Sequence, residues 1–298
     1  MADGAQQMIV YVLQQAVNGL TIGAIYGLIA LGFSMVYKAI GCLNFAHTVS
    51  VMLGALLSHT LIVTLNMNVV VAMFTISVLL YIYGWLVNFF VFRFFQNDSK
   101  ITFMLVSISL AGMLQQAALL LWGPEPRALP SVFGTGRVYM GGVGFPVQNL
   151  VLFGISLLTL ALLLLFFNKT RFGLAMRIAA EDPEAAGLMG VNVAQTRSAT
   201  FSITAVLGGI AGFLVAPLFG VTIGIGQNVA LRMFVAAVVG GVGFLPGAVG
   251  AGLLVGLLES LSAAFISSGW RDVIIFSASI AVLAIRPMGI FRKAVTKY

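Results

Sequence analysis

The chain has 298 residues and a net charge of +7, and 60% of its residues are hydrophobic whereas only 8% are charged. Soluble domains carry about 25% charged residues, so this chain lacks the polar surface that a soluble globular protein needs. The composition excludes that class and indicates an integral membrane protein. The positive charge does not indicate nucleic-acid binding, because the basic residues are scattered between apolar stretches and share no common face.

Apolar stretches long enough for membrane helices recur along the whole chain. They lie at about 8–37, 43–65, 68–92, 101–122, 148–167, 200–225, 232–243, 247–267 and 272–290. We predict an all-α, polytopic transmembrane helical bundle of about eight to nine membrane segments, forming a single domain over 1–298. The first stretch, which Gln14, Gln15 and Asn18 interrupt, and the short stretch starting at Arg232 are candidates for broken or re-entrant helices. Because no cleavable leader pattern precedes it, the first stretch is expected to stay in the mature protein.

The basic residues between these stretches predict the orientation of the chain. The richer set is Lys38, Arg93, Lys100, Lys169, Arg171, Arg177, Arg197, Arg286, Arg292, Lys293 and Lys297. The poorer set is Arg127, Arg137, Arg232 and Arg271. The positive-inside rule places the richer set in the cytoplasm, so nine crossings would put the N-terminus outside and the C-terminus inside.

Glycine and proline mark the other structural features. The external interval 123–148 contains four prolines and several glycines, which predicts turns without a long helix. Small residues four positions apart let membrane helices approach closely. Pairs with this spacing are Gly23 and Gly27, Gly208 and Gly212, Gly220 and Gly224, and Gly252 and Gly256.

The longest cytoplasmic interval, at about 168–199, contains a short predicted helix. Asp182 can cap the free amides of a helix, and Pro183 suits its first position. Glu184 lies in the favourable first turn, and Gly190 is placed to end the helix after about two turns. The residues leave two interpretations open: a knob that inserts into a partner's groove, or an amphipathic connector on the membrane surface.

Three polar features within the apolar stretches are candidates for the transport pathway. Asn44 and His47 adjoin the start of the second stretch, where they either line a gate or tie one helix to its neighbour's backbone. The segment from Gly240 to Pro246 predicts a break between two helices, which is either structural or part of a gate. Glu259 is an acid well inside an apolar stretch, and it needs a partner, a proton or a substrate ammonium group.

Several segments resemble the branched-chain amino acid permease family of LivH type. They are Asn18-Gly-Leu-Thr-Ile-Gly-Ala-Ile-Tyr-Gly-Leu-Ile-Ala-Leu-Gly32, Asn44-Phe-Ala-His47, Met52-Leu-Gly-Ala55, Gly240-Gly-Val-Gly-Phe-Leu-Pro-Gly-Ala-Val249, and Arg286-Pro-Met-Gly289. Glu184-Ala-Ala186 followed by Gly190 is similar to the EAA loop that couples importer permeases to their ATPases. The chain departs from the family where Thr48 and Val49 replace a glycine and an acid, and where Arg232 replaces a lysine.

The resemblance implies a non-catalytic permease subunit of an ABC importer for branched-chain or other hydrophobic amino acids, in the bacterial inner membrane. It implies a second homologous permease or a copy of this chain, two ABC ATPases that hold ATP and Mg, and a periplasmic substrate-binding protein. The chain contains no GxxxxGK[ST] motif, so ATP hydrolysis is expected on separate subunits, and we expect no cofactor or metal on this chain.

The candidate site residues form two groups. Those expected to couple to the ATPases are Glu181, Asp182, Glu184, Ala185, Ala186 and Gly190. Those expected in the pathway or its gate are Asn44, Phe45, His47, Gly240, Gly241, Gly243, Pro246 and Glu259. The alternative is an ion-coupled secondary transporter of small amino or organic acids, with His47 and Glu259 as coupling residues. An intramembrane enzyme is disfavoured, because the sequence has no HExxH or nucleophile motif.

Overall fold

The computed structural model describes residues 2–95, 98–140 and 143–291. Arg292, Lys293 and Lys297 of the predicted cytoplasmic set lie outside the described residues. The long helices are α1 (Ala2–Ile40), α3 (Val69–Val87), α5 (Lys100–Trp122), α6 (Val147–Lys169), α9 (Val193–Phe219) and α11 (Leu245–Phe265). The shorter ones are α2 (His47–His59), α4 (Arg93–Phe95), α7 (Arg171–Glu181), α8 (Pro183–Leu188), α10 (Ile225–Gly240) and α12 (Arg271–Ile285). π-helical turns at Thr60–Thr64 and Asn88–Phe92 extend α2 and α3.

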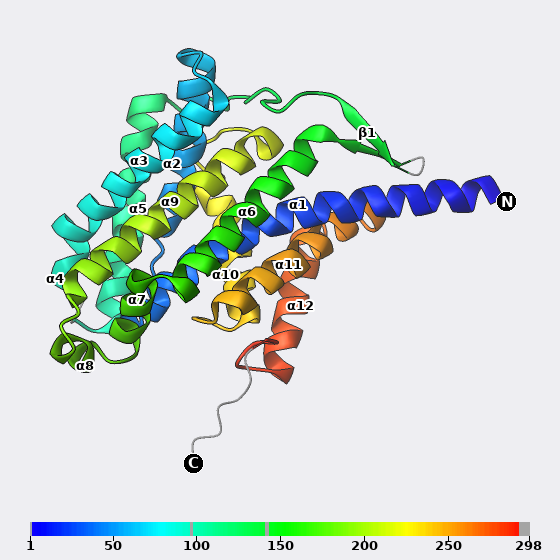
Figure 1. Ribbon diagram of the computed structural model, residues 1–298. Coiled ribbons are helices and arrows are strands. Elements are labelled where there is room, and N and C mark those ends of the chain that lie inside the picture. The colour runs from blue at the N-terminus through cyan, green and yellow to red at the C-terminus, as the bar shows by residue number, and fades with distance from the viewer. Residues whose placement is uncertain (1, 96–97, 141–142, 292–298) are drawn as a thin grey trace.

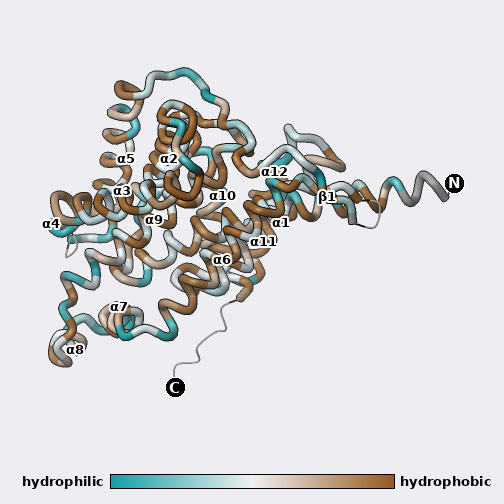
Figure 2. Tube along the Cα trace, turned by 45° about the horizontal axis from the view of Figure 1, so that its top comes forward, coloured by the Kyte–Doolittle hydropathy of each residue, from teal (hydrophilic) through white to brown (hydrophobic). Residues whose placement is uncertain are grey.

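The helices confirm the polytopic bundle. Within the described residues, seven helices are long and apolar enough to cross a membrane, once the π-helical turns are joined to α2 and α3. The other two predicted stretches form α10 and α12, with 16 and 15 residues. Figure 2 shows hydrophobic residues along the long helices and hydrophilic ones in many of the connections between them. An apolar exterior of this kind is what lipid contact requires.

The first helix is continuous, so the expectation that its polar residues break it is wrong. α1 runs for 39 residues without interruption. The side-chain amide of Gln14 donates to the Gly144 carbonyl oxygen at 3.1 Å. Asn149 donates to the side-chain oxygen of Asn18 at 2.7 Å. Because these polar side chains find partners on neighbouring elements, they do not compete with the helix backbone.

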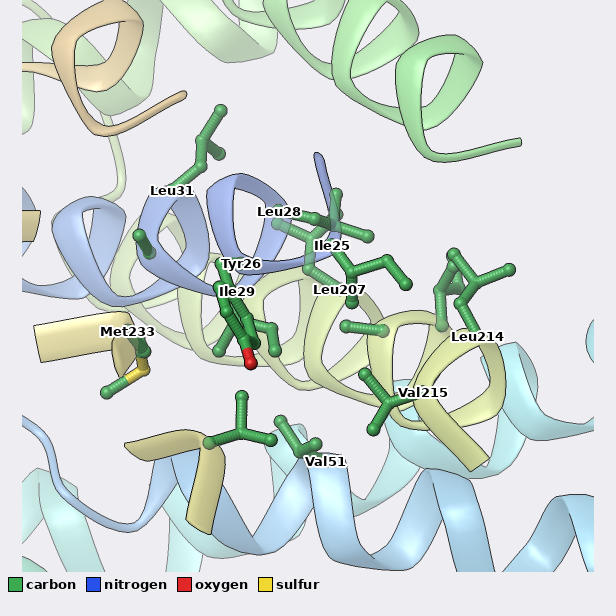
Figure 3. Close-up of a cluster of buried hydrophobic side chains, with 14 of the residues drawn as sticks. Ile25, Tyr26, Leu28, Ile29, Leu31, Val51, Leu207, Leu214, Val215 and Met233 are labelled. Atoms are coloured by element: carbon green, nitrogen blue, oxygen red, sulfur yellow. The ribbon is translucent and has the colours of Figure 1, made fainter. Parts of the chain in front are cut away.

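The core forms where α1 passes between α6, α9, α10 and α11 (Figure 1). Figure 3 shows Ile25 and Ile29 of α1 beside Leu207 of α9, with Val51 of α2 and Met233 of α10 in the same cluster. These side chains are buried and close-packed, so α1 is fixed on several sides. The helix therefore joins α6, α9, α10 and α11.

Glycines allow the closest helix contacts. A Cβ atom added to Gly252 or Gly256 would collide with the α1 backbone at Gly27 or Gly23. On α9, a Cβ on Gly208 would lie 2.7 Å from the Ser50 Cβ of α2. Three of the four predicted pairs therefore lie at helix contacts. The fourth does not: Gly220 and Gly224 flank the turn between α9 and α10, and no atom lies within 4 Å of a Cβ on Gly224.

In the described part of the interval 123–148 no long helix precedes α6, as predicted, and a hairpin leads into α6. β1 (Arg137–Met140) pairs antiparallel with β2 (Val143–Pro146). Arg127 forms an isolated antiparallel bridge with Val221, just after α9. The hairpin lies near the N-terminal end of α1, whereas α7 and α8 lie at the opposite end of the bundle (Figure 1). The bundle thus has two structurally distinct ends.

Candidate translocation site and coupling loop

The short helix predicted after Asp182 is present as α8. The Asp182 carboxylate accepts hydrogen bonds from the backbone amides of Glu184 and Ala185, both at 3.0 Å. Pro183 occupies the first turn, where its missing amide costs nothing. Gly190 has φ +81° in the turn that follows the helix. The local sequence therefore specifies both ends of α8, as expected for a capped two-turn helix.

A second helix in the same loop, α7, ends at Glu181 and was not predicted separately. Thr170 caps it by accepting a hydrogen bond from the Gly173 amide at 2.9 Å. Its buried residues Gly173, Met176 and Ala179 recur every three positions, which is a helical periodicity. The threonine cap and this spacing are the signals that could have identified α7 from the sequence.

The end of α8 presents apolar side chains away from the bundle. Ala186 is fully buried and attaches the helix to the rest of the chain. Leu188 is 91% exposed and Met189 is 62% exposed. Glu184, on the same short helix, is also exposed. An exposed apolar tip beside an acidic side chain is suited to a partner's groove, because water would otherwise cover the apolar surface.

The structure places Asn44, Phe45 and His47 at the junction of α1 and α2. The Asn44 side chain accepts from the Ala46 amide at 3.1 Å. The His47 Nε2 lies 3.2 Å from the Ile29 carbonyl oxygen on α1, and the residue is buried. The His47 contact ties α2 to α1, whereas the Asn44 contact is local to the connection between them. A gating role for the two polar residues stays a prediction.

Phe45 belongs to an aromatic cluster that joins three parts of the chain. Its ring centroid lies 6.2 Å from that of Phe33 on α1 and 6.5 Å from that of Phe234 on α10. The Phe45 amide donates to the Ser107 hydroxyl on α5 at 3.2 Å. A change in the position of Phe45 would therefore affect α1, α5 and α10 together.

The predicted break between two helices lies between α10 and α11. Gly241 and Gly243 have φ of +94° and +81°, values that favour glycine because a side chain would be strained there. Pro246 follows in the first turn of α11. The amide of Ile290, after the closing turn, donates to the Val239 carbonyl oxygen at 2.8 Å. The turn that follows α12 is thus fixed onto the end of α10.

Glu259 is the centre of a buried ion-pair network. Its carboxylate lies 3.1 Å from Arg232 Nε of α10 and 3.2 Å from Arg271 Nη1 of α12. A second nitrogen of Arg232 contacts the Asp272 carboxylate at 2.7 Å. The Glu259 side chain is 3% exposed and the Arg232 side chain 11%. The two arginines provide the partner that a buried acid in an apolar stretch needs.

The predicted apolar stretch starts at Arg232, but the helix that contains this residue starts earlier. The residue lies within α10, which begins seven positions earlier, at Ile225. Hydropathy alone does not reveal where α10 starts, because the polar residues Gln227 and Asn228 precede Arg232 and the apolar stretch becomes evident only after Arg232. The sequence signal that could have paired Arg232 with Glu259 is the requirement for a cation near a lone intramembrane acid.

The network borders a cavity of about 270 Å³. Its lining residues are Tyr26, Phe219, Thr222, Ile225, Asn228, Val229, Arg232, Arg271 and Asp272. α9 begins near α8 and runs away from it, so Phe219 lies toward the end of the bundle opposite α8 (Figure 1). The cavity combines charges of both signs with an apolar wall, whereas the predicted residues Asn44, His47 and Gly240 do not line it.

The family model described as "Branched-chain amino acid transport system / permease component" matches residues 15–283. The chain belongs to this permease family. The high-affinity branched-chain amino acid transport system permease protein LivH of Escherichia coli is 34% identical over 298 residues, which cover 95% of this chain and 96% of LivH. The corresponding protein BraD of Pseudomonas aeruginosa is 34% identical over 295 residues, with the same coverage of both chains.

A more distant likeness covers part of the chain. The xylose transport system permease protein XylH of Haemophilus influenzae is 34% identical over 139 residues, 44% of this chain and 35% of XylH. The family and the apolar helices make this chain a multi-pass permease component of a transport system. The ion-coupled secondary transporter has no support from these relatives.

Proposed function

We propose that this chain is a membrane subunit of an ABC importer that carries branched-chain or other hydrophobic amino acids across the bacterial inner membrane. The relatives named for branched-chain amino acid transport match almost the whole chain, whereas the sugar permease matches less than half of it. The chain itself is non-catalytic. Two partner ATPases bind ATP and Mg, a second permease completes the pathway, and a periplasmic binding protein delivers the substrate.

The observation that carries this proposal is the α8 helix, with its Asp182 cap and its exposed Leu188 and Met189. A helix held by its own cap keeps its shape while its apolar tip inserts into an ATPase groove, so motion can pass between the subunits. In this orientation the α8 end and the C-terminus face the cytoplasm. The hairpin end, with β1 and β2, faces the periplasm and the binding protein.

The test is co-purification of the chain from its native membrane, with partner proteins identified by mass spectrometry. Glu184→Arg reverses the charge beside the apolar tip of α8 and is expected to reduce recovery of the ATPases. Glu125→Arg is the matched control, because Glu125 is also exposed but lies in the interval 123–148 at the opposite end. Leucine uptake by the purified chain alone, in liposomes without ATP, would contradict the proposal.

A further inference from the structure

We propose that the cavity beside Arg232 and Asp272 binds a zwitterionic amino acid with an apolar side chain during its passage. Arg232 holds the substrate carboxylate and Asp272 holds the substrate ammonium group. This inference rests on the proposed function and deepens it, because it names the residues that recognise the substrate class. Both residues line the cavity of about 270 Å³.

The ion pair that opens for the substrate is the one between Arg232 and Asp272. Glu259 cannot be the ammonium site, since each of its two carboxylate oxygens contacts an arginine and its side chain is only 3% exposed. Asp272 contacts both arginines through the single oxygen Oδ1, Arg232 at 2.7 Å and Arg271 at 3.7 Å, and its side chain is 57% exposed. Its carboxylate can therefore turn away while Glu259 keeps Arg232 in place.

Charge balance selects the class of substrate. The four side chains Arg232, Arg271, Glu259 and Asp272 carry two positive and two negative charges, so the network is neutral. When the Arg232–Asp272 contact opens, Arg232 keeps Glu259 and Asp272 keeps Arg271, but each loses its 2.7 Å contact with the other. A zwitterion replaces both partners at once, because its carboxylate pairs with the guanidinium and its ammonium with the carboxylate.

Molecules outside this class replace at most one of the two lost contacts. A carboxylic acid without an amine would pair with Arg232 only, and an amine without an acid would pair with Asp272 only. A neutral sugar has no charged group to pair with either Arg232 or Asp272. The apolar part of the wall, formed by Phe219, Ile225 and Val229, is suited to an aliphatic side chain.

The test uses protection of a cysteine placed in the cavity. The chain has one cysteine, so Cys42→Ser gives a version of this chain without thiols, on which labelling is measured. Thr222→Cys adds a thiol to the cavity wall, and Ser268→Cys adds one at an exposed site that does not line it. The complete transporter, with its co-purified partner subunits in lipid nanodiscs, is treated with a maleimide while L-leucine is added. The compared molecules are 4-methylpentanoate, which lacks the amine of leucine, and 3-methylbutylamine, which lacks its carboxylate.

L-leucine is expected to slow labelling at position 222. The two analogues are expected to leave the labelling rate at position 222 unchanged, and L-leucine is expected to leave the rate at position 268 unchanged. In the Asp272→Asn background, about tenfold more leucine is expected to be needed for the same protection at position 222, because a charge-assisted hydrogen bond is lost. Asp272→Asn is preferred to a change of Arg232, since it leaves the buried Arg232–Glu259 pair intact. Equal protection by leucine and 4-methylpentanoate, or protection that Asp272→Asn leaves unchanged, would overturn the inference.

Uptake by the same transporter preparations, reconstituted into closed proteoliposomes, separates this inference from the proposed function. ATP-dependent leucine uptake without any protection at position 222 would overturn the cavity site and leave the importer standing. Failure of ATP-dependent uptake for leucine, isoleucine and valine alike would overturn the proposed function and the inference that rests on it.

Discussion

Gly23 on α1 lies so close to α11 that an added Cβ atom would stand 2.8 Å from the Cα atom of Leu253. The neighbouring atom is backbone, so it cannot rotate away as a flexible side chain would. In a bilayer, moving apolar surface from lipid into the protein interior lowers the free energy little. Helix association therefore depends largely on close backbone contacts such as this one. The α1–α11 contact therefore depends on the absence of a side chain at this position.

Gly23→Ala is expected to destabilise the bundle by about 1–3 kcal/mol, because the two helices must separate to accommodate the new methyl group. Thermal unfolding of the detergent-solubilised chain measures this change. Gly154→Ala on α6 is the control, since no atom lies within 4 Å of a Cβ there. A Gly23→Ala variant as stable as the Gly154→Ala variant would show that the α1–α11 contact is looser than described.

Glu259→Gln is expected to cost about 3–5 kcal/mol of stability, because it leaves two arginines without their shared buried carboxylate. Glu125→Gln, at an exposed position, is expected to stay within about 0.5 kcal/mol of the parent chain. The measurement is unfolding in detergent. If Glu259→Gln unfolds like the parent, the carboxylate does not hold the arginines. Full transport by this variant would also rule out a direct contact between Glu259 and the substrate ammonium group.

Asp182→Ala is expected to destabilise α8 by about 1 kcal/mol, because two backbone amides lose the oxygen that caps them. A frayed α8 no longer presents a fixed surface, so we expect fewer ATPases to co-purify and slower ATP-driven uptake. Asp182→Asn keeps a side-chain oxygen and is expected to behave nearly like the parent. Equal loss in both variants would mean that the negative charge at position 182, rather than the cap, binds the partner.

Cys42 is expected to react slowly with maleimides near neutral pH. Burial raises the pKa of its thiol, which lies in the connection between α1 and α2 and is 6% exposed. A raised pKa lowers the thiolate fraction at a given pH, and the thiolate is the reactive form. The labelling rate of the folded chain should therefore rise only at a pH higher than that needed by the detergent-unfolded chain. Coincident pH profiles for the two states would contradict this prediction.

Local features of the fold were predictable wherever neighbouring residues determine them. Asp182, Pro183 and Gly190 specify α8 through capping and backbone conformation, both of which act within a few residues. The break after Gly240 follows from the same local rules. The membrane helices follow from apolar length, because lipid requires each one to satisfy its own backbone.

Contacts between distant residues were not predictable in this way. Gln14 and Asn18 look like helix breakers in the sequence, and only their partners near the hairpin and on α6 make them compatible with α1. Arg232 and Glu259 are 27 positions apart, and hydropathy shows Arg232 only as the first residue of an apolar stretch, with no sign of a buried partner. For the same reason the cavity could not be foreseen, since its wall combines side chains from α1, α9, α10 and α12.

The position of α12 links the two ends of the candidate pathway. The helix begins at Arg271 in the ion-pair network, and the turn that follows it ends with Gly289 against the backbone of Gly241. Its 15 residues form a rigid strut about 22 Å long between the cavity and the break after α10. Any rigid-body movement of α12 would therefore shift the ion-pair network and the glycine break together.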